Sequence, residues 1–193
     1  METESLIALF PALLESVPWE VVPASFAVDL LQFCSTSKPI IRSAIRSPSG
    51  NRNPVQNWAK SFGLKVCFDS DEYFFVGRRL EEAMQGRSLD RSCEPHAFEF
   101  GQALGYPQCC CRYVADATEE MIDSLAKSQE QWTFSGSFSL IDPSGYASGC
   151  SLISHLPCST SCELSLVLAT AAVECLLTHS GVKAIQDRWW KWL

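Results

Sequence analysis

Two groups of cysteines are the part of this chain that could do chemistry. The first group is Cys109, Cys110 and Cys111, and the second is Cys158 with Cys162. Thiolates bind metal ions and iron–sulfur clusters, and a cysteine at the start of a helix ionises more easily than an ordinary one. Apolar packing gives no reason for three cysteines in succession. The two groups therefore predict a metal or cluster site.

Both groups stand where a helix is expected to begin. Pro107 suits the first position of a helix, because its φ is fixed and it lacks an N–H, and this places the first group in an opening turn. Thr160 and Glu163 form a capping-box pattern ahead of an apolar run, with Cys162 in the first turn and Cys158 just outside it. Unpaired N–H groups and the helix dipole favour a thiolate there. We therefore expect one site between two helix N-termini.

The spacing of the cysteines bears on which metal they bind. Adjacent residues in a helix point about 100° apart, so Cys109 and Cys110 reach two corners of a large cluster more easily than one zinc ion. Zinc ligands usually come in pairs about two to four residues apart, and only Cys158 and Cys162 do so here. The pattern favours an iron–sulfur cluster, [4Fe-4S], on these four cysteines, with zinc as the alternative. Cys150 could replace one of the four.

His155 is the candidate catalytic residue. It lies three residues before Cys158, and an imidazole there could act as a general base, as a ligand, or as a donor that orients a ligand. The alternative is a residue that bonds the backbone where the chain enters the helix.

The remaining cysteines are expected to be structural. Buried free cysteine packs as a small apolar side chain, and this is our interpretation of Cys34, Cys67, Cys93 and Cys175. The acidic start of the chain lacks the basic region of a signal peptide, so we expect a cytoplasmic protein, in which disulfides are disfavoured.

The residues around both groups resemble a prokaryotic domain-of-unknown-function family. Its motif is Gly-Tyr-Pro-x-Cys-Cys followed by His-x-Pro-Cys-Ser-x-x-Cys, which matches residues 105–110 and 155–162 here. The resemblance covers roughly residues 95 to 170 and brings no established reaction with it. It implies that Cys109, Cys110, His155, Cys158 and Cys162 act as one unit. Cys111 departs from the motif and is read as a neighbour of the site.

The net charge of the chain and its distribution indicate which classes of partner the protein could bind. The chain carries a net charge of −7, which argues against general nucleic-acid binding. Six basic residues and no acidic one lie between residues 30 and 68 (Lys38, Arg42, Arg46, Arg52, Lys60 and Lys65). Such a stretch could receive a small anionic substrate or an acidic partner, with Arg42 and Arg46 as the candidate substrate-binding residues. The alternative is a solvated face that balances the acidic remainder.

The pattern of elements predicts a mainly α fold of the α+β class, a helical domain with a small β-hairpin. The hairpin strands are expected at residues 64–68 and 73–77. Helices are expected at residues 3–16, 24–34, 55–62, 78–85, 95–104, 107–117, 119–131 and 162–179. Residues 134–150 are predicted to be a loop leading into the site. The longest apolar run, residues 164–177, contains Glu174 and is too short to cross a bilayer.

The 193 residues are enough for a substantial core. We expect a helical N-terminal segment (1–60) and a cysteine-cluster domain (61–193) that together form one unit. Three tryptophans close the chain (Trp189, Trp190 and Trp192) and are predicted to pack as a clasp over the core.

Two functions follow from these observations. The first is an iron–sulfur enzyme that uses its cluster on a small carboxylate-bearing substrate, with His155 as the base. The second is a zinc-stabilised binding or interaction module without catalysis.

Overall fold

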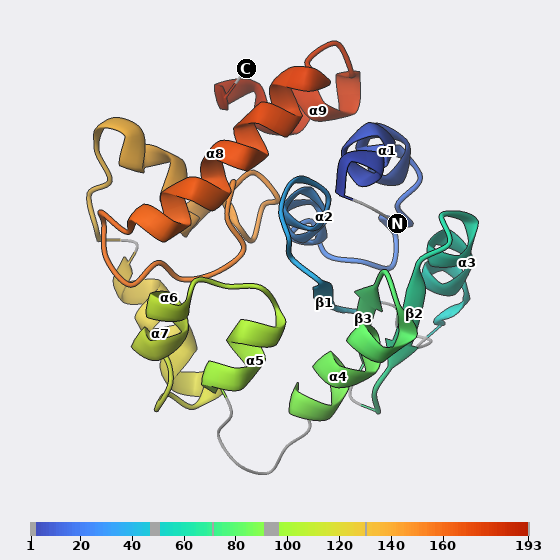
Figure 1. Ribbon diagram of the computed structural model, residues 1–193, viewed down its shortest axis with the longest axis horizontal. Helices are drawn as coiled ribbons and strands as arrows, with labels where there is room; N and C mark the ends of the chain where they lie inside the picture. The colour runs from blue at the N-terminus through green and yellow to red at the C-terminus, as the bar shows by residue number, and fades with distance from the viewer. Residues whose placement is uncertain (1–2, 47–50, 71, 91–96, 130, 193) are drawn as a thin grey trace.

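Helices dominate the computed structural model, which describes residues 3–46, 51–70, 72–90, 97–129 and 131–192 (Figure 1). The predicted mainly α fold with a small antiparallel sheet is confirmed. The helices are α1 (Thr3–Glu15), α2 (Phe26–Ser35), α3 (Asn53–Ser61), α4 (Leu80–Asp90), α5 (Ala97–Ala103), α6 (Gln108–Tyr113), α7 (Glu119–Gln129), α8 (Glu163–Thr178) and α9 (Lys183–Trp189). In the described part of the chain, none of them is long and apolar enough to cross a membrane.

The sheet has three antiparallel strands in the order β1-β3-β2. The predicted hairpin is confirmed as β2 (Lys65–Phe68) and β3 (Tyr73–Gly77), and Val66 pairs with Val76. The sequence analysis missed β1 (Ile40–Ala44), which pairs with β3 through Ile41 and Val76. The segment is short and lies among basic residues, so the sequence analysis did not recognise it as a strand. In the structure, Ile40 and Ile41 are both buried.

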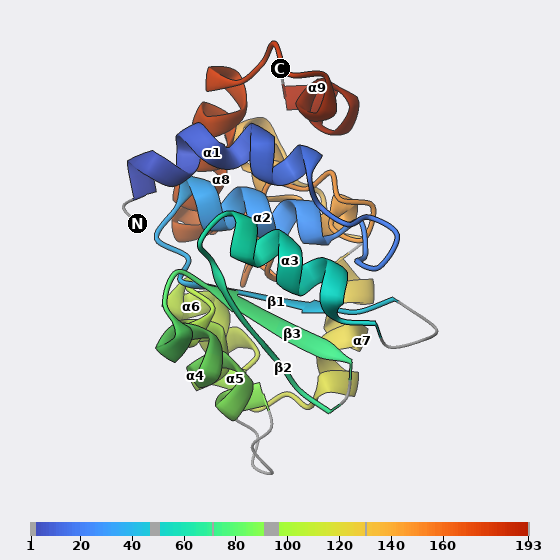
Figure 2. The same ribbon diagram turned by 90° about the vertical axis from the view of Figure 1, so that its right-hand side faces the viewer.

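Each face of the sheet packs against helices. Ile41 and Phe74 point into the main core, which α1, α2, α8 and α9 complete. Phe75 belongs to a smaller core on the other face, together with Ala83 of α4. Figure 2 shows this layering, with α1, α2 and α3 on one side of the sheet and α4 with α5 on the other. Because the side chains of a strand alternate between faces, neighbouring residues of β3 serve different cores.

The C-terminal tryptophans divide between core and surface. Trp189, in α9, is fully buried, and its Nε1 donates to the carbonyl of Ser151 at 3.1 Å. Its ring lies 6.1 Å from that of Phe10 in α1, centroid to centroid. Trp190 is 69% exposed. Trp189 therefore packs in the core as predicted for this segment. Its bond to Ser151 holds the residue that follows the segment 134–150, which contains the 3-10 helices η1 (Gly136–Ile141) and η2 (Pro143–Gly145).

A buried ion pair joins α2 to the segments that carry the cysteines. The Nζ of Lys38 lies 2.8 Å from Oδ1 of Asp29 and 2.8 Å from Oγ of Ser154, and 4.6 Å from the ring centroid of Tyr106. The hydroxyl of Tyr146 donates to the other oxygen of Asp29 at 2.7 Å. Burial lowers the pKa of Lys38, but Asp29 and Tyr106 raise the pKa more, so the ammonium stays charged. Lys38, read from sequence as part of an open basic stretch, points inward instead.

Replacement of Lys38 tests the importance of this pair. Lys38→Met should lower the free energy of unfolding by about 3–5 kcal/mol, because it leaves the carboxylate of Asp29 buried and without its cation. Lys60→Met is the matched control, since Lys60 is exposed on α3, and it should change stability by about 0.5 kcal/mol or less. Urea unfolding followed by circular dichroism measures both. Equal unfolding midpoints for the two variants would contradict the assignment.

Candidate metal centre

Residues 105–107, just before the first cysteine group, form the turn between α5 and α6. Gly105 has φ of +79° and follows the end of α5. The N–H of Gly105 bonds to the carbonyl of Gln102, and the N–H of Tyr106 bonds to the carbonyl of Gly101. This is the Schellman pattern that a left-handed residue allows after a helix. Pro107 then caps α6, which starts at the next residue. The turn requires glycine at 105 and sends the chain directly into the cysteines.

The three cysteines of α6 have different surroundings. Cys110 is buried and Cys109 is half-buried, and both belong to the cysteine group described below. Cys111 is buried against Gly101, where an added Cβ would lie 2.9 Å from its sulfur. Burial raises the pKa of Cys111 to about 11. Cys111 is a packing residue beside the site, as the motif predicted.

The second cysteine group is held by α7 and α8. Cys158 lies in the loop before α8, and Nε2 of Gln129 donates to the carbonyl of Pro157 at 2.7 Å. Cys162 is the N-cap residue of α8. The expected start of this helix is thus correct to one residue. The capping-box reading is wrong, because it placed the cap at Thr160, two residues early.

Four sulfurs meet between the starts of α6 and α8. The Sγ atoms of Cys109, Cys110, Cys158 and Cys162 all lie within 4.8 Å of one another. Cys162 lies 3.6 Å from both Cys109 and Cys110, sulfur to sulfur, and those two are 3.9 Å apart. The four cysteines are positioned to bind a metal ion, as predicted. Cys150 is not in this group, and its sulfur lies 3.6 Å from the carbonyl of Ser148.

A buried hydroxyl joins two of the sulfurs to His155. Ser165, in the first turn of α8, is fully buried, and its hydroxyl donates to the sulfur of Cys162 at 3.2 Å. The same oxygen lies 3.4 Å from the sulfur of Cys110 and 2.8 Å from Nε2 of His155. The sequence analysis missed Ser165. Its position three residues after an N-cap cysteine was the available signal, because that spacing brings a side chain back over the cap.

The local field favours ionisation of one thiol above the others. Burial raises the pKa of Cys162, but hydrogen bonding from Ser165 and from the neighbouring thiols outweighs burial and brings the pKa to about 7. Burial raises the pKa of Cys158 to about 11 and raises that of Cys110 further. A bound cation would offset this cost, since it stabilises thiolates directly. Of these three thiols, Cys162 is therefore the one whose pKa lies closest to neutral pH.

His155 is a buried neutral imidazole at the edge of the cysteine group. It is 8% exposed, and its ring lies 5.2 Å from that of Tyr106, centroid to centroid. Burial, and secondarily the ammonium of Lys38, lower the pKa of His155 to about 3. Its Nε2 contacts Ser165, while Nδ1 has no hydrogen-bond partner among the described residues. His155 is therefore linked to the sulfur of Cys162 through the hydroxyl of Ser165. A role as a catalytic base stays a prediction.

The two candidate substrate-binding arginines lie on and beyond β1. Arg42 forms an ion pair with Asp90 at 2.9 Å, and its guanidinium lies 3.9 Å from the ring centroid of Tyr73. Arg46 follows β1 and is exposed. Arg42 is thus engaged by protein groups on the sheet, and the substrate-binding role of both arginines stays a prediction.

The structural cysteines behave as expected where the structure describes them. Cys34 of α2 and Cys175 of α8 are buried in the main core. Burial raises the pKa of both, that of Cys175 to about 12. Cys67 is half-buried, with its sulfur 3.0 Å from the carbonyl of Ala83. Cys93 lies outside the described residues.

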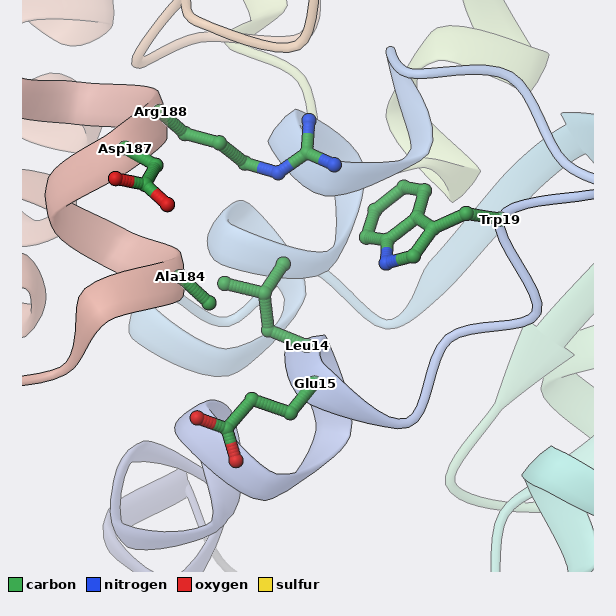
Figure 3. Close-up of a pocket in the computed structure, with 6 residues that line it drawn as sticks. All are labelled: Leu14, Glu15, Trp19, Ala184, Asp187 and Arg188. Atoms are coloured by element: carbon green, nitrogen blue, oxygen red, sulfur yellow. The ribbon is translucent and has the colours of Figure 1, made fainter.

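A pocket of about 370 Å³ lies between the end of α1, the segment after it and α9 (Figure 3). Arg188 extends over the indole of Trp19 at 4.1 Å from the ring centroid, and the carboxylates of Glu15 and Asp187 line the pocket with them. Cysteine and histidine are missing from this lining. The pocket is therefore separate from the chemistry of the cysteine group.

Comparison of the chain with known protein families, with curated proteins and with solved structures gave no match. The assignment of the site therefore rests on its geometry and on the chemistry of its donor atoms.

Removal of the Ser165 hydroxyl tests its support of the sulfurs. Ser165→Ala should weaken metal binding about 10- to 100-fold, the usual effect of losing a hydrogen bond that orients a ligand. Ser161→Ala is the control, because Ser161 is exposed in the loop just before α8, and it should bind metal like the wild type. Competition with a chromogenic chelator measures both affinities. Equal affinities for the two variants would exclude a role for the hydroxyl.

Proposed function

We propose that this protein binds one zinc ion through Cys109, Cys110, Cys158 and Cys162, and that it is a zinc-stabilised module without catalysis at the metal. The observation that carries the proposal is the separation of the sulfurs. Zinc binds sulfur at about 2.3 Å in a tetrahedron, so its ligand sulfurs lie about 3.8 Å apart. The three sulfur-to-sulfur distances among Cys109, Cys110 and Cys162 are 3.6, 3.6 and 3.9 Å.

The separation of the sulfurs supports a four-iron cluster less well than a single zinc ion. The cysteine sulfurs of such a cluster bind four different irons on its outside, so they stand farther apart than sulfurs that share one ion. The sulfurs here all lie within 4.8 Å of one another, which leaves room for one ion at their centre. The iron–sulfur enzyme predicted from sequence is therefore the competing hypothesis.

The closed ligand set favours a structural role. Catalytic zinc sites keep an open position for water or substrate, whereas structural sites use four protein ligands. Four sulfurs already surround one point here, and two of them, Cys110 and Cys162, are buried. The ion would join the start of α6 to the start of α8 and to the loop that carries Cys158. His155 contacts the cysteine group through the hydroxyl of Ser165.

Metal analysis tests the identity of the ion. Protein purified without oxygen should contain one zinc per chain and be colourless, because zinc has a filled d shell. Replacement of zinc by cobalt should give the intense visible bands of a tetrahedral thiolate site. A brown protein with several irons and inorganic sulfide per chain would overturn the zinc proposal in favour of the cluster.

Single substitutions test which cysteines bind the metal. Cys158→Ser and Cys162→Ser should each lose most of the zinc, because each removes one of four thiolates. Cys34→Ser and Cys175→Ser are the controls, since both residues lie in the core away from the cysteine group, and they should retain it. Zinc content is measured by mass spectrometry of the intact protein. Equal retention in all four variants would contradict the ligand assignment.

Removal of the metal tests its structural role. At a zinc concentration about a thousandfold above the dissociation constant, binding adds about 4 kcal/mol to stability. For a chain of this size, that corresponds to a fall in Tm of roughly 8–16 °C when a chelator removes the ion. Differential scanning calorimetry measures the shift, and re-addition of zinc should reverse it. A Tm unchanged by complete zinc removal would argue against a structural metal.

A further inference from the structure

The four sulfurs of the cysteine group are not equivalent. Cys110 and Cys162 are 2% and 5% exposed, whereas Cys109 and Cys158 are half-buried. The buried pair also receives the hydroxyl of Ser165, which lies 3.4 Å from the sulfur of Cys110 and 3.2 Å from that of Cys162. The cysteine group therefore has a protected pair and an accessible pair.

This difference determines where a small electrophile reacts. Oxidation of cysteine follows thiolate character and exposure, and metal binding makes all four cysteines thiolates at neutral pH. A hydrogen-bond donor withdraws charge from a sulfur and lowers its nucleophilicity, and within the protected pair the Ser165 hydroxyl donates to the sulfur of Cys162. In the zinc-bound protein, Cys109 and Cys158 would be thiolate ligands that solvent can reach, because both are half-buried. They come from different elements, α6 and the loop before α8.

We propose that Cys109 and Cys158 form a peroxide-sensitive pair whose oxidation releases the zinc ion. The inference rests on the proposed zinc site and adds a modification site to it. The two sulfurs lie within 4.8 Å of each other. A disulfide needs them at about 2.05 Å, and the loop position of Cys158 allows this approach without breaking a helix.

The chemistry balances with hydrogen peroxide as the oxidant. One thiolate attacks the O–O bond, which breaks to give a sulfenic acid and hydroxide. The second thiolate attacks the sulfenic sulfur, forms the S–S bond and expels a second hydroxide. Two electrons thus pass from the sulfurs to the peroxide. Only Cys110 and Cys162 then remain as thiolate ligands, too few for a tetrahedral site, and the ion leaves.

The test treats zinc-loaded protein with hydrogen peroxide. A chromogenic chelator follows zinc release, and mass spectrometry of peptides from protein alkylated before digestion maps the disulfide. The expected result is one zinc released per chain together with a Cys109–Cys158 disulfide. Dithiothreitol and zinc should restore the starting state. Cys150→Ser is the control, because Cys150 is half-buried but outside the cysteine group, and it should release zinc at the wild-type rate.

The outcomes separate the inference from the proposed function. Zinc that stays bound while peroxide oxidises Cys150 would overturn the inference and leave the zinc site standing. A first disulfide between Cys110 and Cys162 would also overturn it, because the protected pair would then be the reactive one. A purified protein that binds no zinc contradicts the proposed function, and the inference falls with it.

Discussion

The ammonium of Lys38 sits where three segments of the chain meet. It bonds Asp29 in α2 and Ser154 before the second cysteine group, and it lies over the ring of Tyr106 before the first. Residues adjacent to these contacts lead directly to Cys109 on one side and to His155 and Cys158 on the other. A buried charge tolerates little displacement, because separation from its partner costs several kcal/mol. The positions of both cysteine groups therefore depend on an ion pair that contains no cysteine.

A chain of polar contacts extends from this pair to the sulfurs. Tyr106 stacks on His155, His155 bonds Ser165, and Ser165 reaches Cys110 and Cys162. Each bond in the chain restricts the next side chain to one orientation, which is how outlying residues tune a metal site. The core therefore helps to position the cysteine group independently of any bound metal.

The local sequence pattern was sufficient to predict those elements that are determined by residues close together in the chain. The hairpin of β2 and β3 and the helix after Cys162 follow from strand composition and apolar runs. The four clustered cysteines could be identified because their spacing has no packing explanation. The inward turn of Lys38 and the contact between Ser165 and His155 could not be identified, since they depend on partners about ten to more than a hundred residues away. The short distance of 3.9 Å between the sulfurs of Cys109 and Cys110 could not be predicted either, because an average helical angle does not specify the side-chain rotamers.

The distance along the chain between the two cysteine groups has a consequence for how the protein is made. Cys110 and Cys162 are 52 residues apart, and closing a flexible loop of that length costs on the order of 3–4 kcal/mol in chain entropy. During synthesis, the first group leaves the ribosome with only two of the four ligands of a site. A metal ion present at that stage would find only two ligands. Tight binding would require that α8 has been synthesised and has packed against α2. With the proposed zinc site, loading of the ion would be a late event of folding, because all four ligands come together only when both halves of the core have met.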